Sequence, residues 1–479
     1  MDKEEKTRAE NSIEKNHGEE TVNYGNGFAD RSPEEILALF REKVEKKDSS
    51  ELRQLLAALL DSDSFCEFEP LGGAESSAAD IGEVPPGDSA VCGFGLLNNR
   101  RVALIGLDPS VNSGTLSASG SRKIVRLIKR ALEYKLPLII LVDSMGINEA
   151  GGLAALAESV AVFHAFSRCE GKIPRISVLL GKCRQTACFF PGLSDIVIAV
   201  DNGETIDFAG QQPSQAIPGP EGGQAIVDVY AESKNKALEQ VVRCLNYLPD
   251  NCHERSFILT SKPPQSSKAL TDLVPADKTK PYDVKNVLKA VFDGQSFMEL
   301  KSRYARNAVT GFARLGGCSV GVVANQPRYR AGTLDVRATE KLASFIDFCD
   351  RFSLPVITLV DLPGFLPAAD QERRGLIRRA GELLAAYSRA TVPLLTLITR
   401  KSYDASYVVM GSDGLGVDVV LAWPGAEIAL TESKHEGNEL YQFGDPWEAA
   451  RKGYIDNVIK PEETRRSLLQ HLKIILNLP

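Results

Sequence analysis

Two short apolar segments of nearly the same wording stand out in the hydrophobic pattern of the chain. LPLIILVDSMG occupies residues 136–146, and LPVITLVDLPGF occupies residues 354–365. Each is an uncharged run rich in branched side chains that meets an aspartate and then a glycine-containing turn. Such a run is typical of a strand that is buried on both faces of a parallel sheet. We therefore predict two buried strands that end in carboxylates, Asp143 and Asp361.

Apolar runs and amphipathic stretches alternate over most of the chain. Between residues 89 and 200, short apolar runs are separated by stretches of helical period, which indicates an α/β fold. Residues 201–222 are rich in Gly, Pro and Gln and predict a loop, whereas 224–248 return to a helical period. The α/β pattern then restarts at residue 281 and continues to the end.

An amphipathic helical pattern precedes the first of these units, over residues 32–61. Ser32 followed three residues later by Glu35 fits the start of a capped helix. A polar break at residues 48–50 divides the pattern, so two helices are predicted.

The two α/β units are copies of one another. An offset of 218 residues, as between Gly93 and Gly311, brings glycines, prolines and aspartates of both units into phase without a gap. The pairs are Gly93 with Gly311, Pro109 with Pro327, Gly114 with Gly332, Lys123 with Lys341, Asp143 with Asp361, and Gly146 with Gly364. Further on the offset becomes 219, as between Lys182 and Lys401. Because these residue types mark backbone geometry, the match predicts an internal duplication.

These patterns predict four segments. Residues 1–30 are charged and polar and predict a disordered tail. The first copy with its preceding helices occupies 31–250, a Pro- and Lys-rich linker occupies 251–280, and the second copy occupies 281–479.

Composition and charge narrow the possible functions. The chain is 43% hydrophobic and 25% charged, with a formal net charge of −7. An acidic chain of this kind disfavours a general nucleic-acid or anionic-membrane surface, but it leaves open a local basic pocket for phosphates. No uncharged apolar run approaches the roughly 18–20 residues that span a bilayer. The acidic N-terminus does not resemble a secretory signal, and scattered cysteines suit a reducing compartment, so we expect a cytoplasmic protein.

The sequence lacks the common signatures of nucleophilic, nucleotide-binding and metal catalysis. It contains no G-x-S-x-G, Walker A or H-E-x-x-H pattern. Strand–turn–helix junctions can still catalyse, because backbone N–H groups at a helix start are unpaired and carry part of the helix dipole. Two such groups can stabilise the enolate that forms when a proton or a carboxyl group leaves the carbon next to a carbonyl group.

Cys183 and Cys188 are the only cysteines close in sequence to one another. Their spacing has no second pair and no nearby histidine to complete a zinc site, so we expect buried thiols and no metal. We also expect Trp423 in the core or in an interface.

Several charged residues favour structural roles. Asp143 and Asp361 are expected to cap the turns that follow their strands. Lys123 and Lys341 lie on predicted helices, where a solvated side chain is the default expectation.

Two groups of arginines leave their role open. Arg328 and Arg330 flank a turn and fit either a phosphate contact or a structural ion pair. A second group favours a solvated or partner-facing helix side: Arg373, Arg374, Arg378 and Arg379.

Longer stretches of the second copy resemble a known family. They read GFARLGGCSVGVVANQP, AGTLDVRATEKLASFIDFCDRFSLPVITLVDLPGFLP, ATVPLLTLITRKSY and DPWEAARKGYIDNVIKPEETR. They are similar to the carboxyltransferase (β) subunits of biotin-dependent acyl-CoA carboxylases, such as propionyl-CoA carboxylase. They also resemble the related α subunits of glutaconyl-CoA and methylmalonyl-CoA decarboxylases. The resemblance implies an α/β fold of two tandem crotonase-like domains, of the ClpP/crotonase superfamily.

The resemblance also implies ligands and partners. The first domain would bind acyl-CoA, and the second would bind carboxybiotin that is attached to a separate carrier protein, with no metal and no nucleic acid. The chain would form a head-to-tail dimer, alone or in a hexamer built as a trimer of dimers. Its partners would be a biotin carboxylase and a biotin carrier subunit or, in a decarboxylase, a membrane subunit.

On the biotin side, the family turn RKAYGGAY reads RKSYDASY here. The resemblance assigns the amides of Ala405 and Ser406 to the biotin oxygen, and Asp404 replaces a glycine beside them. Val408, in a position that selects the acyl group, stands where propionyl enzymes often have an aspartate, which suggests a different acyl chain. The remaining biotin-side positions are Tyr407, Gly364 and Phe365.

On the acyl side, the family turn GPCAGGA reads GKCRQTA. The resemblance assigns the amides of Gln185 and Thr186 to the thioester oxygen, where two glycines are expected. Arg184 adds a third large side chain, and Asn148 replaces an arginine of the family. The remaining positions implied to bind substrate are Gly114, Gly146 and Val408.

Three hypotheses follow. The first is a carboxyltransferase that moves CO2 between carboxybiotin and an acyl-CoA. The second is the α subunit of a biotin-dependent acyl-CoA decarboxylase coupled to a sodium pump. The third is a catalytically degenerate paralogue with a structural or regulatory role in a mixed oligomer, favoured by the altered acyl-side turn.

Overall fold

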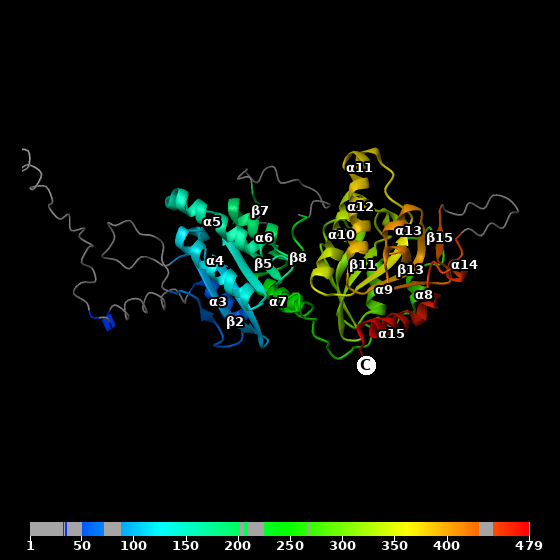
Figure 1. Ribbon diagram of the computed structural model, residues 1–479, viewed down its shortest axis with the longest axis horizontal. Helices are drawn as coiled ribbons and strands as arrows, with labels where there is room; N and C mark the ends of the chain where they lie inside the picture. Colours follow the sequence, from blue (N-terminus) through cyan, green and yellow to red (C-terminus); the bar gives the residue numbers. More distant parts are fainter. Residues whose placement is uncertain are drawn as a thin grey trace, which may run out of the picture.

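The computed structural model describes residues 32, 34–35, 50–70, 88–201, 206–208, 225–266, 268–430 and 444–478. Statements about structure concern these residues. The predicted tail at 1–30 lies outside them. Figure 1 shows two lobes side by side, each a sheet covered by helices.

The first lobe is built on one mixed sheet in the order β1-β2-β3-β4-β5-β6-β8, with β7 beside β5. Strands β2 and β3 form an antiparallel hairpin, and β3 to β6 run parallel. The strands are β1 (Cys66–Glu67), β2 (Ala90–Leu97), β3 (Arg100–Leu107), β4 (Leu138–Ser144), β5 (Arg175–Arg184), β6 (Ile196–Val200), β7 (Ile206–Asp207) and β8 (Val229–Ala231).

The second lobe repeats this sheet in the order β16-β14-β13-β12-β11-β10-β9, with β15 beside β13. Its hairpin is β10–β11, and β11 to β14 run parallel. The strands are β9 (Met298–Leu300), β10 (Ala308–Leu315), β11 (Cys318–Asn325), β12 (Val356–Leu362), β13 (Leu394–Tyr403), β14 (Val419–Ala422), β15 (Glu427–Ala429) and β16 (Asn457–Val458).

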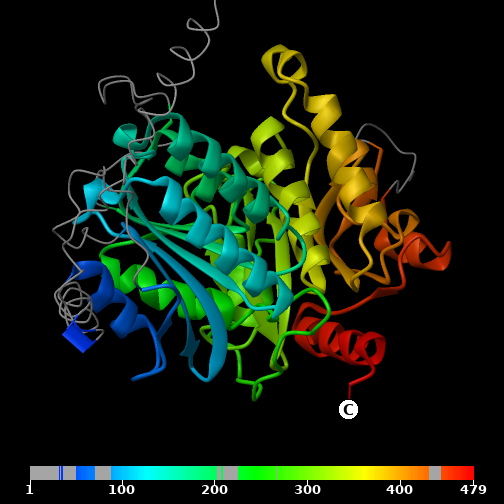
Figure 2. The same ribbon diagram turned by 60° about the vertical axis from the view of Figure 1, so that its left-hand side comes forward.

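Helices cover both sheets (Figures 1 and 2). In the first lobe they are α3 (Glu51–Leu59), α4 (Ala118–Glu133), α5 (Gly152–Ser167), α6 (Phe189–Leu193) and α7 (Lys234–Leu245). In the second lobe they are α8 (Leu270–Leu273), α9 (Val284–Val291), α10 (Val336–Arg351), α11 (Ala369–Arg373), α12 (Leu376–Arg389), α13 (Ala405–Val409), α14 (Pro446–Arg451) and α15 (Thr464–Leu476).

The predicted helix starts before the first sheet are confirmed where the structure describes them. Ser32 N donates to a Glu35 carboxylate oxygen at 2.7 Å, and Glu35 N donates to Ser32 Oγ at 3.2 Å, which is a capping box. Ser50, at the predicted break, caps α3 by accepting from Arg53 N. Both buried strands, β4 and β12, are confirmed as well.

The duplication extends to details of backbone geometry. An isolated bridge joins Leu116 to Ile147 in the first lobe and Leu334 to Phe365 in the second, 218 residues apart. The register between the two central strands shifts between Val142 and Ser144, and again in the second lobe between Val360 and Leu362.

The prediction that Lys123 and Lys341 are solvated is wrong. Both are buried, because α4 and α10 lay these faces against the hairpins. Lys123 Nζ donates to Ala90 O at 3.0 Å, and Lys341 Nζ donates to Ala308 O at 2.8 Å. The two lysines bind equivalent carbonyls at the start of the two hairpins, so they are structural twins.

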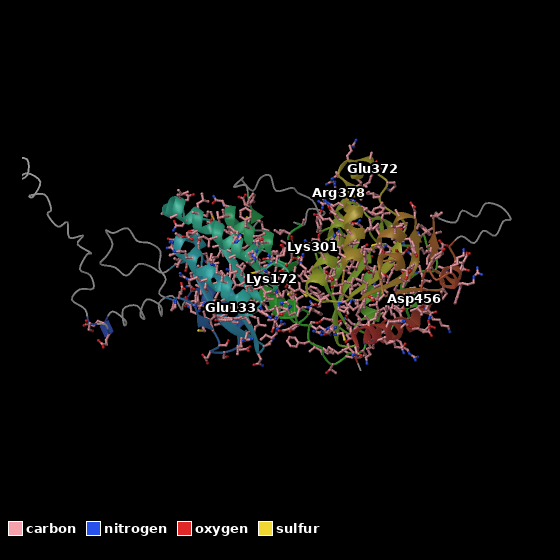
Figure 3. All side chains as sticks on the ribbon, viewed as in Figure 1. Glu133, Lys172, Lys301, Glu372, Arg378 and Asp456 are labelled. Carbon is pink, nitrogen blue, oxygen red and sulfur yellow. The ribbon has the colours of Figure 1, made fainter. Side chains whose placement is uncertain are left out.

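The lobes pack against each other through the segment that follows α7. Tyr247 stacks on Phe312 of β10 with ring centroids 5.4 Å apart, and Arg314 lies over the Tyr247 ring. Arg351 at the end of α10 approaches Asp195 of the first lobe at 3.8 Å. In Figure 3, Lys172 and Lys301 mark the facing sides of the two lobes.

Candidate active site

Both lobes end their longest parallel strand in the same unusual corner. Strand β5 ends at Arg184 and β13 at Tyr403, and the next residues, Gln185 and Asp404, have φ of 48° and 46°. This left-handed region is disfavoured for side chains other than glycine. The corners are 219 residues apart, as the repeat requires, and each opens directly into a helical turn.

The corner of the second lobe presents two backbone amides. Asp404 N donates to Ala429 O at 2.9 Å, and Tyr407 N donates to Asp404 O at 3.1 Å, so the turn is fixed on both sides. Helix α13 begins at Ala405, where the first amides have no partner within the helix. None of the turn and cap hydrogen bonds among the described residues uses the amide of Ala405 or Ser406 as donor.

The corner of the first lobe has the same design with larger side chains. Arg184 is extended, and a 3-10 turn runs from Gln185 to Cys188 before α6. The amides of Thr186 and Ala187 donate in none of the turn and cap hydrogen bonds of the described chain. The Thr186 hydroxyl is shielded from solvent without a hydrogen-bond partner.

A cavity of about 420 Å³ lies beside the corner of the second lobe. Its apolar lining comes from Tyr407 and Val408 of α13, from Ile428 and Leu430 around β15, and from Tyr454. Asp404, Asp445, Glu448 and Lys452 border the same space, and Val408 is 47% exposed. The cavity therefore has an apolar wall beside the two amides and a rim with three carboxylates and one lysine.

A sequence model of the carboxyl transferase domain matches residues 44–441. The chain belongs to the carboxyl transferase family. The family predicted from the sequence is therefore confirmed.

Two curated relatives match this chain over most of their length. One is the carboxyltransferase subunit of propionyl-CoA carboxylase from Haloferax mediterranei, 35% identical over 88% of this chain and 90% of the relative. The other is the α subunit of methylmalonyl-CoA decarboxylase from Veillonella parvula, 33% identical over 91% of each chain.

A solved structure agrees with the fold. The crystal structure of transcarboxylase 12S, with hydrolysed methylmalonyl-coenzyme A bound, superposes with a TM-score of 0.84 at 32% identity. The superposition covers 93% of this chain and 95% of that one. The predicted α/β fold of two tandem crotonase-like domains is confirmed.

Glycines form the turns that lie next to both corners. Gly146 O accepts from Leu116 N at 2.8 Å, and Gly364 O accepts from Leu334 N at 3.2 Å. Gly114 has φ of 71°, and a Cβ there would lie 2.0 Å from Asp143 O. Only glycine fits so close to Asp143 O, and the turn before α4 can therefore lie against the end of β4.

Gly146 lies next to the corner of the first lobe. A Cβ on Gly146 would meet Gln185 Oε1 at 2.9 Å and Gln185 Cβ at 3.1 Å. The Gln185 side chain thus lies over the Gly146 turn. Around Gly364 a Cβ would meet nothing within 4 Å, so the equivalent space of the second lobe is open.

The aspartates that end β4 and β12 bind the neighbouring strand, whereas the sequence predicted that they cap the turns after their own strands. Asp143 Oδ1 accepts from Lys182 N at 3.0 Å, and Asp361 Oδ1 accepts from Lys401 N at 3.2 Å. Each carboxylate therefore fixes the end of the neighbouring strand that carries the corner.

Cys183 and Cys188 lie on either side of the corner of the first lobe, with sulfur atoms 3.9 Å apart. Both thiols are free and buried, as predicted. Their mutual hydrogen bond, with burial, raises the pKa of Cys183, whereas it lowers the pKa of Cys188.

Sequence reasoning missed Ala187 and the cavity wall formed by Ile428 and Leu430. The 219-residue offset was sufficient to find the first, because it aligns Thr186 with Ala405 and Ala187 with Ser406. The wall has no such signal, since β15 contributes only three residues from a loop region.

Proposed function

We propose that this chain is the carboxyltransferase component of a biotin-dependent acyl-CoA carboxylase. It transfers a carboxyl group between carboxybiotin, attached to a separate carrier protein, and the α-carbon of an acyl-CoA. The observation that carries the proposal is the pair of equivalent corners, one in each lobe, that present helix-start amides next to left-handed residues. We assign acyl-CoA to residues 31–250, carboxybiotin to residues 281–479, and a linker role to residues 251–280.

In the first lobe, the corner holds the thioester oxygen of the acyl-CoA. When a proton or carboxyl group leaves the α-carbon, negative charge develops on that oxygen, and two amides stabilise it. We assign this role to the amide of Thr186 together with one neighbour: Gln185, as the family resemblance implies, or Ala187, as repeat symmetry with Ser406 indicates. Gly114, Gly146 and Arg184 shape the approach of the thioester.

In the second lobe, the corner holds the other ligand. Biotin supplies the carboxyl group when it is bound. The amides of Ala405 and Ser406 hold its urea oxygen, and Gly364 and Phe365 lie on the neighbouring turn. The apolar cavity beside Tyr407 and Val408 fits a compact uncharged ring or a short acyl chain.

If each lobe binds one ligand, carboxyl transfer requires an assembly in which a first lobe and a second lobe face each other. Helix α5 carries exposed Leu153, Leu156 and Val160 on one face, while its other face packs against α4. The segment Glu149–Ser167 is apolar and long enough to span a bilayer. We assign this face to a subunit contact, because an exposed apolar stripe of this kind typically marks an interface.

A homo-oligomer follows from that assignment. We propose a head-to-tail dimer, alone or within a hexamer built as a trimer of dimers, in which the first lobe faces the second lobe of a partner copy. Hexamer assembly is described for transcarboxylase 12S. A biotin carboxylase and a biotin carrier subunit would be the other partners, and the compartment would be the cytoplasm.

One observation favours each alternative. The Veillonella relative is a decarboxylase subunit, which supports the reverse reaction with a membrane partner. The Gln185 side chain over Gly146 narrows the acyl-side corner, which supports a degenerate paralogue in a mixed oligomer.

Carboxylation of a panel of acyl-CoAs with a carboxylated biotin carrier tests the proposal. We expect turnover of at least one acyl-CoA, and a higher kcat/KM in Gln185→Gly because the thioester gains space. If neither the natural chain nor Gln185→Gly turns over any acyl-CoA, although both bind CoA, the chain is not a carboxyltransferase. Purification with a membrane protein and release of CO2 would instead indicate the decarboxylase.

A further inference from the structure

A cationic cavity of about 260 Å³ lies in the second lobe, apart from the corner at Asp404. Three segments converge on it: the loop before β10, the turn between β11 and α10, and helix α11. Because β10 is antiparallel to its neighbours, all three segments meet at the carboxyl edge of the parallel strands. This is the edge at which ligands bind in open α/β sheets.

The charge of the cavity is opposite to that of the chain. Its lining includes five arginines: Arg303, Arg306, Arg330, Arg337 and Arg374. Two carboxylates, Asp335 and Asp370, face them, and Arg303 also pairs with Asp201 outside the lining, which leaves an excess of two positive charges. The whole chain has a net charge of −7, so this concentration of positive charge is local. Such an excess attracts anions.

Part of this charge is held in place by neighbouring groups. The Arg306 guanidinium lies 4.0 Å from the centre of the Tyr329 ring and donates to its hydroxyl. Arg330, at φ of 50°, binds Asp335 at 2.6 Å. Gln371 Oε1 accepts from Val336 N at 3.0 Å, which ties α11 to the start of α10. A ligand would find these donors already positioned.

Three of the five arginines have no carboxylate partner among the described residues. Within the described part of the chain, Arg306, Arg337 and Arg374 form no ion pair with a carboxylate within 4.0 Å. Figure 3 places Glu372 and Arg378 at the exposed top of the same lobe, so the neighbouring helix surface is solvated. The three guanidinium groups therefore differ from Arg379, which pairs with Glu382.

We propose that this cavity is a binding site for a phosphate-bearing ligand that presents a diphosphate or two nearby phosphate groups. Guanidinium groups bind phosphate oxygens through paired N–H donors, and several of them together favour a multiply charged anion over a single carboxylate. The site is separate from the two amide corners and does not rest on the proposed carboxyl transfer. The phosphate groups belong either to the nucleotide end of a coenzyme A or to a free phosphorylated metabolite.

Calorimetric titration with inorganic pyrophosphate at about 0.15 M ionic strength tests the site. We expect saturable binding to the full-length chain, weakened about tenfold or more in Arg374→Gln and in Arg306→Gln. The matched control is Arg373→Gln, because Arg373 is an exposed neighbour of Arg374 on α11 that does not line the cavity. Unchanged unfolding temperatures without ligand would show that the variants are folded.

Two results would overturn the site. One is the absence of pyrophosphate binding at that ionic strength, and the other is equal weakening in Arg373→Gln, which would indicate general charge attraction. Titration with acetyl-CoA in the presence of saturating pyrophosphate then identifies the source. Competition that Arg374→Gln abolishes assigns the site to coenzyme A phosphates, whereas independent binding of the two ligands assigns it to a separate phosphorylated ligand.

Discussion

Asp361 Oδ2 accepts a hydrogen bond from Arg400 Nε at 2.7 Å, and both side chains are buried at 3% and 6% exposure. Arg400 also donates to the carbonyl oxygens of Pro275, Asp277 and Lys280. The pair thus joins the strand before the corner of the second lobe to the segment between the lobes. In the first lobe the position of Arg400 is taken by Gly181, so Asp143 has a different environment.

Substitution of these aspartates should have unequal effects on stability. Asp361→Ala leaves a buried guanidinium without its carboxylate, and we expect a loss of about 3 kcal/mol or more. Asp143→Ala removes a hydrogen bond to Lys182 N and is expected to cost about 1 kcal/mol. Urea unfolding of both variants checks the difference. Equal losses would contradict the structural role given to Arg400.

Asp404→Gly should stabilise the corner of the second lobe. Asp404 has φ of 46° and ψ of −130°, a region that suits glycine and is strained for other residues by about 1–3 kcal/mol. Part of the gain is offset because glycine makes the unfolded chain more flexible, so we expect a net gain of about 1 kcal/mol. Thermal unfolding measures it. Asp404→Ala, which removes the charge and keeps Cβ, is the control and should show no such gain.

The fold was predictable because its signals are local and repeated. The uncharged runs around Asp143 and Asp361 identify buried strands, and the constant offset between them identifies the duplication. Ser32 and Glu35 revealed a helix start for the same reason, since a capping box involves residues three apart.

The errors arose where a side chain acts across the fold. In the sequence, Lys123 and Lys341 look solvated. Their hydrogen-bond acceptors are the backbone carbonyl oxygens of Ala90 and Ala308, which lie about thirty residues away along the chain and leave no pattern in the side chains. The cationic cavity was equally hidden, since Arg306, Arg330 and Arg374 come from three separate segments. In the sequence, Arg330 fits either a phosphate contact or an ion pair, but nothing there brings Arg306 and Arg374 next to it.

Lys341 should make stability depend on pH. Burial is the main cause that lowers the pKa of Lys341 from 10.5 to about 7, and nearby Glu299 opposes it. Since the folded pKa lies below the unfolded one, the unfolded chain binds more protons between these values, and stability should rise with pH from 7 to 10.5. The slope attributable to Lys341 is at most about 1.4 kcal/mol per pH unit.

The Lys341 contribution is measured as the difference in unfolding free energy between the natural chain and Lys341→Met across this pH range. Burial also raises the pKa of Asp228 to about 6, so that stability falls as pH rises from about 4 to 6. Lys341 is one of the charges that lower this pKa, so the effect differs between the two proteins, but it lies at lower pH than the titration of Lys341. A difference that stays constant from pH 7 to 10 would show that Lys341 does not titrate in this way.

The exposed apolar face of α5 should be required for assembly. Leu153 is 79% exposed and Val160 is 63% exposed, and together with Leu156 they form one stripe along the helix. In the double variant Leu153→Glu and Val160→Glu, association would bury two carboxylates, so we expect a lower oligomeric mass by light scattering at the same protein concentration. Ile474→Glu is the control, because Ile474 is an equally exposed apolar residue on α15. If the double variant keeps the natural mass, or if the control loses it too, α5 is not the subunit contact. If only the double variant loses mass, the two ligand sites are no longer brought together. Carboxyl transfer should then fall, while CoA binding to the isolated subunit persists.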